Sequence, residues 1–309
     1  MSLQKRVQKK KVSIVMTAYN RKDQLRFTLE TISNSIYLNL EIIVVDDASD
    51  EHERFDTEDR RTDYENKLYY ELDVKVIRIN KEDKTWINPC MSYNIGIKEA
   101  TGDIIIIQNS EVCHIGDCIL YVVNNLEKGD WLSLNCYGLG GFDQNSSLIF
   151  NFFTKTSSIY DYINTIHRDI SSPIGGSVLF NDNPQGWLNH HRDFFTAYHY
   201  FGAIYREDLI TKMDGGFCEE YKNGICLDDN DFIKYLIHTG FRFTTTQFRK
   251  DIPFVVHQYH RKCINLGDKF EHYHNINKHV FTNRMNKIRA SLIIDIKVEN
   301  YMPEPHLLC

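Results

Sequence analysis

Hydrophobic and polar positions in the first fifty residues follow two different periods. Residues 12–16 and 41–45 are short, mostly β-branched apolar runs, and each ends in small polar or acidic residues. Residues 22–37, between them, carry apolar side chains at helical spacing. This pattern predicts a strand, a helix and a second strand of a parallel sheet. Ligands bind at the carboxyl edge of such sheets, so the polar residues that end the two strands are candidates for a site.

The same rhythm continues along the chain. Residues 74–79 and 103–107 are further predicted strands, and residues 91–100 and 117–126 are predicted helices. Residues 51–66 are rich in charge, which is typical of an exposed helix or loop. Strands that alternate with helices predict an α/β fold with a mostly parallel sheet and right-handed crossovers.

The pattern changes near residue 130. Aromatic residues, Asn, Gly and His become frequent, and residues 140–186 are expected to form long loops with short elements. Helical spacing returns near the C-terminus. We therefore expect a first half over 1–130, a substrate-facing half over 131–260 and a helical extension over 261–309.

Composition excludes several classes. The net charge of −6 argues against a nucleic-acid-binding surface, and there is no apolar stretch of the roughly 18 residues that a membrane helix needs. The eight cysteines are scattered without CxxC spacing, which favours reduced thiols and a cytoplasmic location. A basic cluster near the N-terminus is interpreted as a solvated arm, with weak membrane-surface contact as the alternative. Its members are Lys5, Arg6, Lys9, Lys10 and Lys11.

The first strand is not followed by a glycine-rich phosphate loop, so a Walker site and a dinucleotide fingerprint are both excluded. Thr, Asn, Arg and paired Asp residues stand at the strand ends instead. Such a set suits a nucleotide that is recognised by side chains.

Five motifs in the correct order resemble the inverting, family-two-like glycosyltransferases of the GT-A fold. They are residues 12–21, residues 44–49, Asn94-Ile95-Gly96 with residues 100–103, Gly215-Gly216-Phe217, and residues 227–232. The resemblance covers roughly residues 11–260. It implies a mostly parallel sheet flanked by helices, and transfer of a sugar from a nucleotide-diphosphate donor, preferably a UDP-sugar, to a glycan, lipid-linked sugar or protein acceptor.

The resemblance also implies a divalent metal ion, Mn²⁺ or Mg²⁺, which such enzymes hold with an Asp-x-Asp motif. Here Asn109 replaces the first carboxylate with a neutral oxygen donor, and Glu111 keeps the second. His257, just after an apolar strand, is the expected late metal ligand, with His260 as the second choice. The alternatives are a strand-end turn with a solvated Glu111 and a structural His257.

The donor is expected at the ends of the first two strands. Asp47 would accept a hydrogen bond from the imide nitrogen of uracil, and Thr17, Tyr19 and Arg21 lie where base, ribose and phosphate pass. Asn94 is also predicted to bind the donor. Alternatively, Asp46 or Asp47 caps a following helix.

An inverting transfer needs a general base that takes a proton from the acceptor hydroxyl. The resembling family uses the second acid of a pair at the start of a helix. This implies Asp229 as the base, with Asp228 binding acceptor hydroxyls or orienting the loop. Asp231 follows closely, and all three acids could instead cap the helix and favour its dipole.

The acceptor is expected near Trp187, Asn189 and His190. A Trp face stacks on sugar rings, and Asn and His supply directional hydrogen bonds. A Trp that anchors a loop to the core is the alternative.

Two other function classes remain open. One is a nucleotide-sugar-binding protein without turnover, against which the Asp228-Asp229 pair argues because a binder needs no base. The other is a nucleotidyltransferase, which would carry a glycine-rich, basic loop after the first strand. Retaining transfer is also open, although the paired acids favour inversion.

Overall fold

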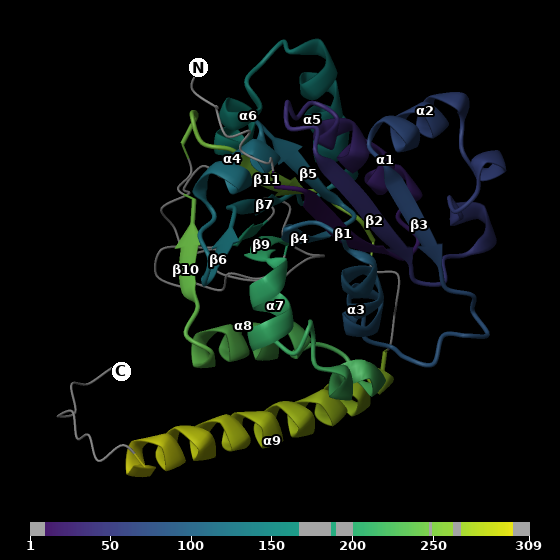
Figure 1. Cartoon of the computed structure of the whole chain (residues 1–309). Coiled ribbons are helices and arrows are strands. Elements are labelled where there is room, and N and C mark those ends of the chain that lie inside the picture. Colours follow the sequence, from purple (N-terminus) through teal and green to yellow (C-terminus); the bar gives the residue numbers. More distant parts are fainter. Residues whose placement is uncertain (1–9, 167–186, 190–199, 247–248, 262–266, 299–309) are drawn as a thin grey trace, which may run out of the picture.

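A seven-stranded sheet forms the centre of the molecule in a computed structural model (Figure 1). Its strand order is β10-β6-β9-β4-β1-β2-β3. The structure describes residues 10–166, 187–189, 200–246, 249–261 and 267–298, of which residues 187–189 and 291–298 are described by their backbone alone.

The predicted parallel strands lie next to one another. β1 (Val12–Ala18) pairs in parallel with β2 (Leu40–Asp46) on one side and with β4 (Ile104–Asn109) on the other, and β3 (Val74–Arg78) extends the sheet beyond β2. Their carboxyl ends therefore share one edge of the sheet. This arrangement confirms the α/β fold that the sequence predicts.

Strands from later in the chain complete this sheet. β6 (Asp130–Ser133) and β10 (Arg242–Thr245) are parallel to each other, and β9 (Phe201–Tyr205) runs antiparallel to both β4 and β6. The residues on either side of position 130 thus contribute strands to one sheet.

A second sheet of four strands has the order β5-β11-β7-β8. It consists of β5 (Val112–Ile115), β7 (Cys136–Gly138), β8 (Trp187–Asn189) and β11 (Phe254–His257).

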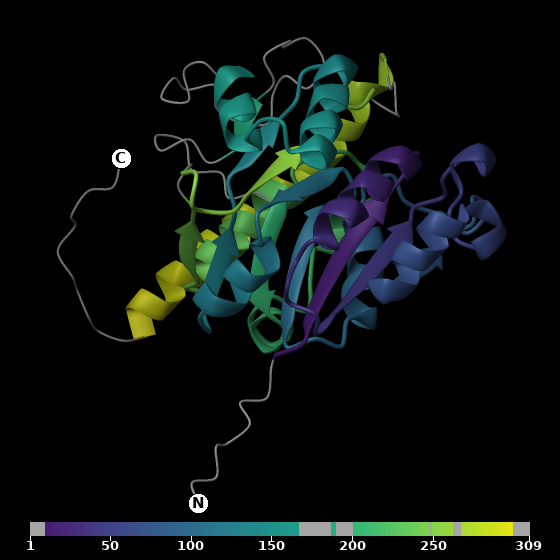
Figure 2. The same ribbon diagram turned by 90° about the horizontal axis from the view of Figure 1, so that it is seen from above.

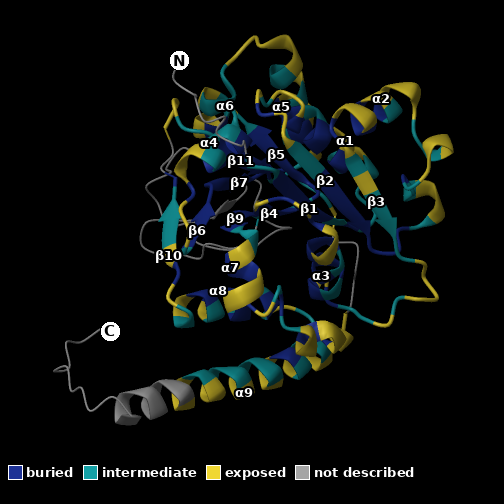
Figure 3. Ribbon diagram, in the orientation of Figure 1, coloured by how far each residue is buried: buried dark blue, intermediate teal, exposed yellow. Residues whose placement is uncertain are grey.

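Helices cover both faces of the large sheet (Figure 2). On one face, α1 (Lys22–Ile32), α2 (Asp63–Glu71) and α4 (Cys118–Asn125) pack on the side chains that alternate strand residues present. The other face carries α3 (Cys90–Glu99), α7 (Arg206–Lys212) and α8 (Asp228–His238). The central strands between these layers are buried, the edge strands β3 and β10 are partly exposed, and the exposed residues lie mainly on the outer helix faces and loops (Figure 3).

The region expected to form long loops contains two helices in its described part. α5 (Phe142–Thr154) and α6 (Ile159–Ile166) pack through Leu148 and Ile163 against a third apolar cluster. For residues 142–166 the expectation of long loops was wrong, because Asn, Ser and exposed Phe residues mask the helical spacing of the few buried positions.

The C-terminal extension is helical, as its spacing predicts. α9 (Lys269–Val298) runs along α8 in Figure 1 and packs on it through Val280 and Phe281. Short 3₁₀ helices occur at Glu51–Glu53, Glu58–Arg60 and Glu219–Asn223. Among the described residues, no helix combines the length and apolar character needed to cross a bilayer.

Candidate active site

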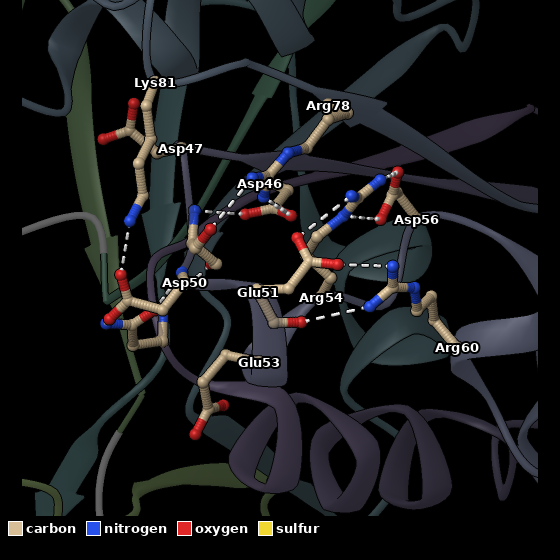
Figure 4. Close-up of polar contacts among 12 residues, drawn as sticks. Asp46, Asp47, Asp50, Glu51, Glu53, Arg54, Asp56, Arg60, Arg78 and Lys81 are labelled. Carbon is tan, nitrogen blue, oxygen red and sulfur yellow. Dashed lines mark hydrogen bonds and ion pairs between the residues drawn. The ribbon is translucent and has the colours of Figure 1, made fainter.

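The two acids that end β2 have different surroundings (Figure 4). Asp46 is fully buried, pairs with the Arg78 guanidinium and accepts a hydrogen bond of 3.0 Å from the Ser49 amide. It therefore fixes the turn after β2 and ties it to β3, and the alternative of a helix cap does not apply to it. Farther along this turn, Asp50 pairs with Lys81 at 2.6 Å.

Asp47 points the other way, toward α3 and the loop that precedes it. Its carboxylate accepts hydrogen bonds from Ser92 Oγ at 2.8 Å, Trp86 Nε1 at 3.0 Å and Lys84 Nζ at 2.8 Å. The Lys84 ammonium also lies 5.1 Å from the centre of the Tyr19 ring. Sequence reasoning missed Lys84 and Trp86, because neither belongs to a motif.

Thr17 and Asn109 are register partners at the ends of β1 and β4. Tyr93 Oη donates a hydrogen bond of 2.9 Å to Asn109 Oδ1. The residues that the sequence assigns to donor binding on these two strands thus share the carboxyl edge of the sheet.

Glu111, His257 and His260 form a compact cluster. Glu111 Oε1 lies 3.3 Å from His257 Nε2 and 3.3 Å from His260 Nε2, and the ligand atoms of all three lie within 4.8 Å of one another. Burial alone would raise the pKa of Glu111, but hydrogen bonds from the two histidines outweigh burial and hold this pKa well below its ordinary value. Burial lowers the pKa of His257, which favours the neutral imidazole that binds metals.

The backbone explains why this cluster forms. Val112 at the start of β5 is the antiparallel register partner of His257 at the end of β11, and the Gln258 amide donates to the Glu111 carbonyl at 3.0 Å. Glu111 is thereby held beside His257, 146 positions away in the sequence. Arg21 joins the cluster from the other side, with Nη2 at 2.7 Å from His260 Nδ1.

The acids at the start of α8 follow an unusual turn. Cys226 and Leu227 both have left-handed backbone conformations, with φ of 58° and 68°. Such non-glycine residues are costly and persist only where their surroundings enforce them. The turn presents Asp228 to Asn88, whose Nδ2 donates a hydrogen bond of 2.9 Å to its carboxylate.

The three acids of this segment have different partners. Asp231 is buried and accepts a hydrogen bond of 2.8 Å from Arg284 Nε on α9, which assigns it a structural ion pair. Asp228 is buried, and Asp229, which is mostly buried, accepts a hydrogen bond from the Asn230 amide at 2.8 Å. Burial, reinforced for Asp229 by the charge of Asp228, raises the pKa values of both members of this pair.

The beginning of α3 connects the parts of the site that come from distant segments. Three side chains at or just before its first turn each contact one of them. These contacts are Asn88 with Asp228, Ser92 with Asp47, and Tyr93 with Asn109. The acid pair, the end of β2 and the end of β4 therefore surround one helix end.

Residues 13–174 match the sequence model of glycosyl transferase family 2, which is just over half of the chain. The chain belongs to this family. The resemblance found in the sequence is thus confirmed. The family 2 match ends before α8 and α9, so it does not include the acid pair.

Individual relatives agree with this assignment. The chain is 28% identical over 169 residues to a dolichol-phosphate mannosyltransferase of Pyrococcus furiosus, covering 54% of this chain and 45% of the relative. A second curated relative, an uncharacterized glycosyltransferase of Bacillus subtilis, is 30% identical over 122 residues, or 40% of each chain. The family 2 chain therefore spans less than half the length of these curated relatives.

Solved structures share the fold. S. aureus TarS (residues 1–349) with UDP-GlcNAc has a TM-score of 0.51 at 15% identity, covering 82% of this chain and 59% of that 1–349 chain. GalNAc-T7 with UDP, GalNAc and Mn²⁺ has a TM-score of 0.51 at 12% identity, covering 83% and 45%.

Asn94 has a contact that the sequence does not predict. Its amide donates to the Phe217 carbonyl at 2.8 Å and accepts from the Phe217 amide at 2.8 Å, so the Asn94 motif is fastened to the Gly215-Gly216-Phe217 motif. At Gly96, a Cβ would lie 2.6 Å from Val15 Cγ1, so glycine lets α3 lie close against β1. Packing between α3, β1 and the Gly215-Gly216-Phe217 turn is therefore sufficient to explain why these residues stand in the Asn94-Ile95-Gly96 and Gly215-Gly216-Phe217 motifs.

The predicted acceptor residues are placed only in part. Trp187 and Asn189 lie on β8, paired in register with Gly138 and Cys136 of β7. Their side chains are not described, and His190 lies outside the described residues. The same holds for Lys5, Arg6 and Lys9 of the basic cluster.

Proposed function

We propose that this chain is an inverting, metal-assisted glycosyltransferase that takes its sugar from a UDP-sugar. The observation that carries the proposal is the convergence of Glu111, His257 and His260, which come from two distant segments, at the donor edge of a family 2 fold. One carboxylate and two imidazoles are a donor set that favours a transition-metal ion such as Mn²⁺ over Mg²⁺.

These three residues would hold the ion, with Asn109 close by at the end of β4. When bound, Mn²⁺ supplies Lewis-acid stabilisation of the departing diphosphate. Arg21, beside His260, would bring a guanidinium to the same phosphates.

Asp47 is the proposed recognition group for the uracil base of the donor, with Tyr19 and Trp86 near it. The uracil imide would replace one of the donors that now bind the Asp47 carboxylate. Two observations support uridine. The Asp47 carboxylate only accepts hydrogen bonds, which suits the imide N–H of uracil. TarS and GalNAc-T7, which share the fold, were solved with UDP-GlcNAc and with UDP.

Asp229 is the proposed general base, which accepts the proton of the acceptor hydroxyl. Its raised pKa makes the carboxylate a better proton acceptor near neutral pH than an ordinary aspartate. The carboxylate takes the acceptor hydroxyl proton while the acceptor oxygen bonds to the anomeric carbon. The bond from that carbon to the diphosphate oxygen breaks, and the diphosphate leaves with the electron pair.

The acceptor is proposed to be a glycan, a lipid-linked sugar or a protein, bound near β8 by Trp187, Asn189 and His190. The P. furiosus relative is named as a dolichol-phosphate mannosyltransferase, so a lipid that carries a phosphate is a further acceptor to test beside these. We propose a cytoplasmic site of action on the basis of the scattered cysteines.

Calorimetry with UDP tests the metal and donor assignments. UDP should bind at least about tenfold more tightly with Mn²⁺ than with EDTA, because metal contacts to phosphate are worth several kcal/mol. Glu111→Gln and His257→Ala should abolish this difference, whereas exposed Glu82→Gln and His279→Ala should keep it. Equal UDP affinity with and without Mn²⁺ would show that the metal assignment is wrong.

Release of UDP from UDP-sugars, measured with water or an added acceptor, tests the base. Asp229→Asn should lower kcat by about 10²-fold or more and leave UDP affinity nearly unchanged, because asparagine keeps the shape and cannot take a proton. Asp228→Asn should act more weakly and mainly on acceptor KM. Full activity of Asp229→Asn would show that another residue is the general base. Wild-type protein that binds UDP-sugars without releasing UDP would favour the alternative of a nucleotide-sugar-binding protein without turnover.

A further inference from the structure

Helix α9 lies against the turn that leads into α8. This helix follows the matched part of family 2 by almost a hundred residues, and the site described above uses none of its side chains. Two of them nevertheless reach the segment that carries Asp228 and Asp229.

The first contact is made by Asn277, which is fully buried. Its Nδ2 donates a hydrogen bond of 2.9 Å to the carbonyl of Cys226, the first of the two residues with left-handed backbone. The backbone of α9 adds a second bond, since the Ile225 amide donates to the Tyr273 carbonyl at 3.3 Å. Together these bonds fix the residues on which the direction of the following turn depends.

The fit between the turn and α9 is tight. A Cβ at Gly224 would lie 2.3 Å from Asn277 Oδ1 and 2.6 Å from the Tyr273 carbonyl oxygen, closer than real Cβ atoms approach. Glycine is therefore required at 224 for the backbone to reach α9. Among the residues that the structure describes, the buried Asn277 Oδ1 has no hydrogen-bond partner, which carries an energetic cost.

The second contact lies one turn into α8. Arg284 Nε donates to Asp231 Oδ1 at 2.8 Å, and the Arg284 guanidinium also lies 5.6 Å from the centre of the Tyr235 ring. Asp231 in turn donates its amide to the Leu227 carbonyl at 2.9 Å, the first hydrogen bond of α8. Arg284 thus holds the end of the turn that Asn277 holds at its beginning.

We propose that Asn277 and Arg284 are positioning residues, through which α9 holds the Gly224–Leu227 turn so that Asp229 faces the donor in the orientation needed for proton transfer. Two consecutive left-handed, non-glycine residues are energetically costly and relax when their support is removed. A relaxed turn would displace the Asp229 carboxylate, and a displacement of about 1 Å can cost up to about 10²-fold in rate. This inference rests on Asp229 being the base.

The test uses the full-length chain with Asn277→Ala, Arg284→Met and the α9 control Asn283→Ala, whose side chain is exposed. UDP release from UDP-GlcNAc and other UDP-sugars gives kcat and donor KM. Calorimetry with UDP and Mn²⁺ gives donor affinity, and hydrogen exchange of residues 224–228 reports the turn without any substrate. Two variants at separate contacts guard against one that fails to fold.

We expect both variants to lower kcat about tenfold or more, with donor KM and UDP affinity unchanged, and to speed exchange at 224–228. Asn283→Ala should match wild type in all three measurements. Faster exchange with unchanged kcat would overturn the proposal, and so would kcat and UDP affinity that fall together, because that pattern indicates general loss of the fold. Asp229→Asn, measured in parallel, separates the two claims: if it stays fully active, the base assignment fails, and if only the α9 variants stay active, this inference fails alone.

Discussion

Asp229→Asn should stabilise the folded protein at alkaline pH while it removes the proposed base. Burial and the neighbouring charge of Asp228 raise the pKa of Asp229 from its ordinary 3.8 to about 7 in the folded chain. The unfolded chain loses its proton near the ordinary value, so between these two pH values the folded state binds more protons. The free energy of unfolding therefore falls as pH rises through this window and stays low above it.

The magnitude follows from the pKa difference. A rise of about three pH units corresponds to about 4 kcal/mol at 1.36 kcal/mol per unit, reached in full above about pH 8. At pH 5 only about 1–2 kcal/mol of this loss has accumulated, because the window is only partly crossed. Asparagine has no proton to lose and keeps the oxygen that accepts from the Asn230 amide. The stability gain of the variant over wild type should therefore be about 2–3 kcal/mol larger at pH 8 than at pH 5.

Urea unfolding of both proteins at pH 5, 6, 7 and 8 measures this difference. Titrating groups away from the Asp228–Asp229 pair change stability in both proteins alike, so they cancel in the comparison. Glu82→Gln, an exposed carboxylate on a turn, is the control and should show the same difference from wild type at every pH. A gain for Asp229→Asn that does not grow with pH, or a loss at pH 8, would refute the reasoning that Asp229 is held as a strained carboxylate.

Two further predictions concern the stability of the sheet that carries the site. Arg78→Met leaves the fully buried Asp46 carboxylate without its partner and should lower the free energy of unfolding by about 3–5 kcal/mol, measured by urea denaturation. Gly202→Ala places a Cβ 2.0 Å from Trp131 Cζ2 in the core and should destabilise by about 1–3 kcal/mol or more in thermal melts. The double variant with Trp131→Phe should recover part of that loss, and an unaffected single variant would contradict the packing argument.

The sequence predicts best what depends on period and on strand ends. Runs of buried β-branched residues mark β1, β2 and β4, and the polar residue that ends each run lies at the sheet edge by geometry alone. Thr17, Asp47 and Asn109 share that edge for this reason. The approach of Glu111 to His257 could be expected from the family resemblance, but its cause is the pairing of β5 with β11, which local pattern does not encode.

What the sequence does not reveal is which contacts each polar group makes. Lys84 and Trp86 bind Asp47 from a loop whose course no periodicity fixes, and Asn94 contacts Phe217 across more than a hundred residues. These pairings depend on how helices and loops pack after the sheet has formed. A motif therefore locates a residue at the site without showing whether it binds a ligand or the backbone.

The acid segment 228–231 shows the same limit most clearly. Any of the three aspartates in these four positions could cap the helix, and in the sequence only the family resemblance singles out Asp229 as the base. In the structure, helix α9 distinguishes the three acids. Arg284 of α9 forms an ion pair with Asp231, whereas Asp228 and Asp229 lie together and have raised pKa values. Helix α9, which matches no family motif, thus pairs with one acid and leaves the other two as the pair whose burial raises their pKa values, and carboxylates with such raised pKa values are candidates for catalysis.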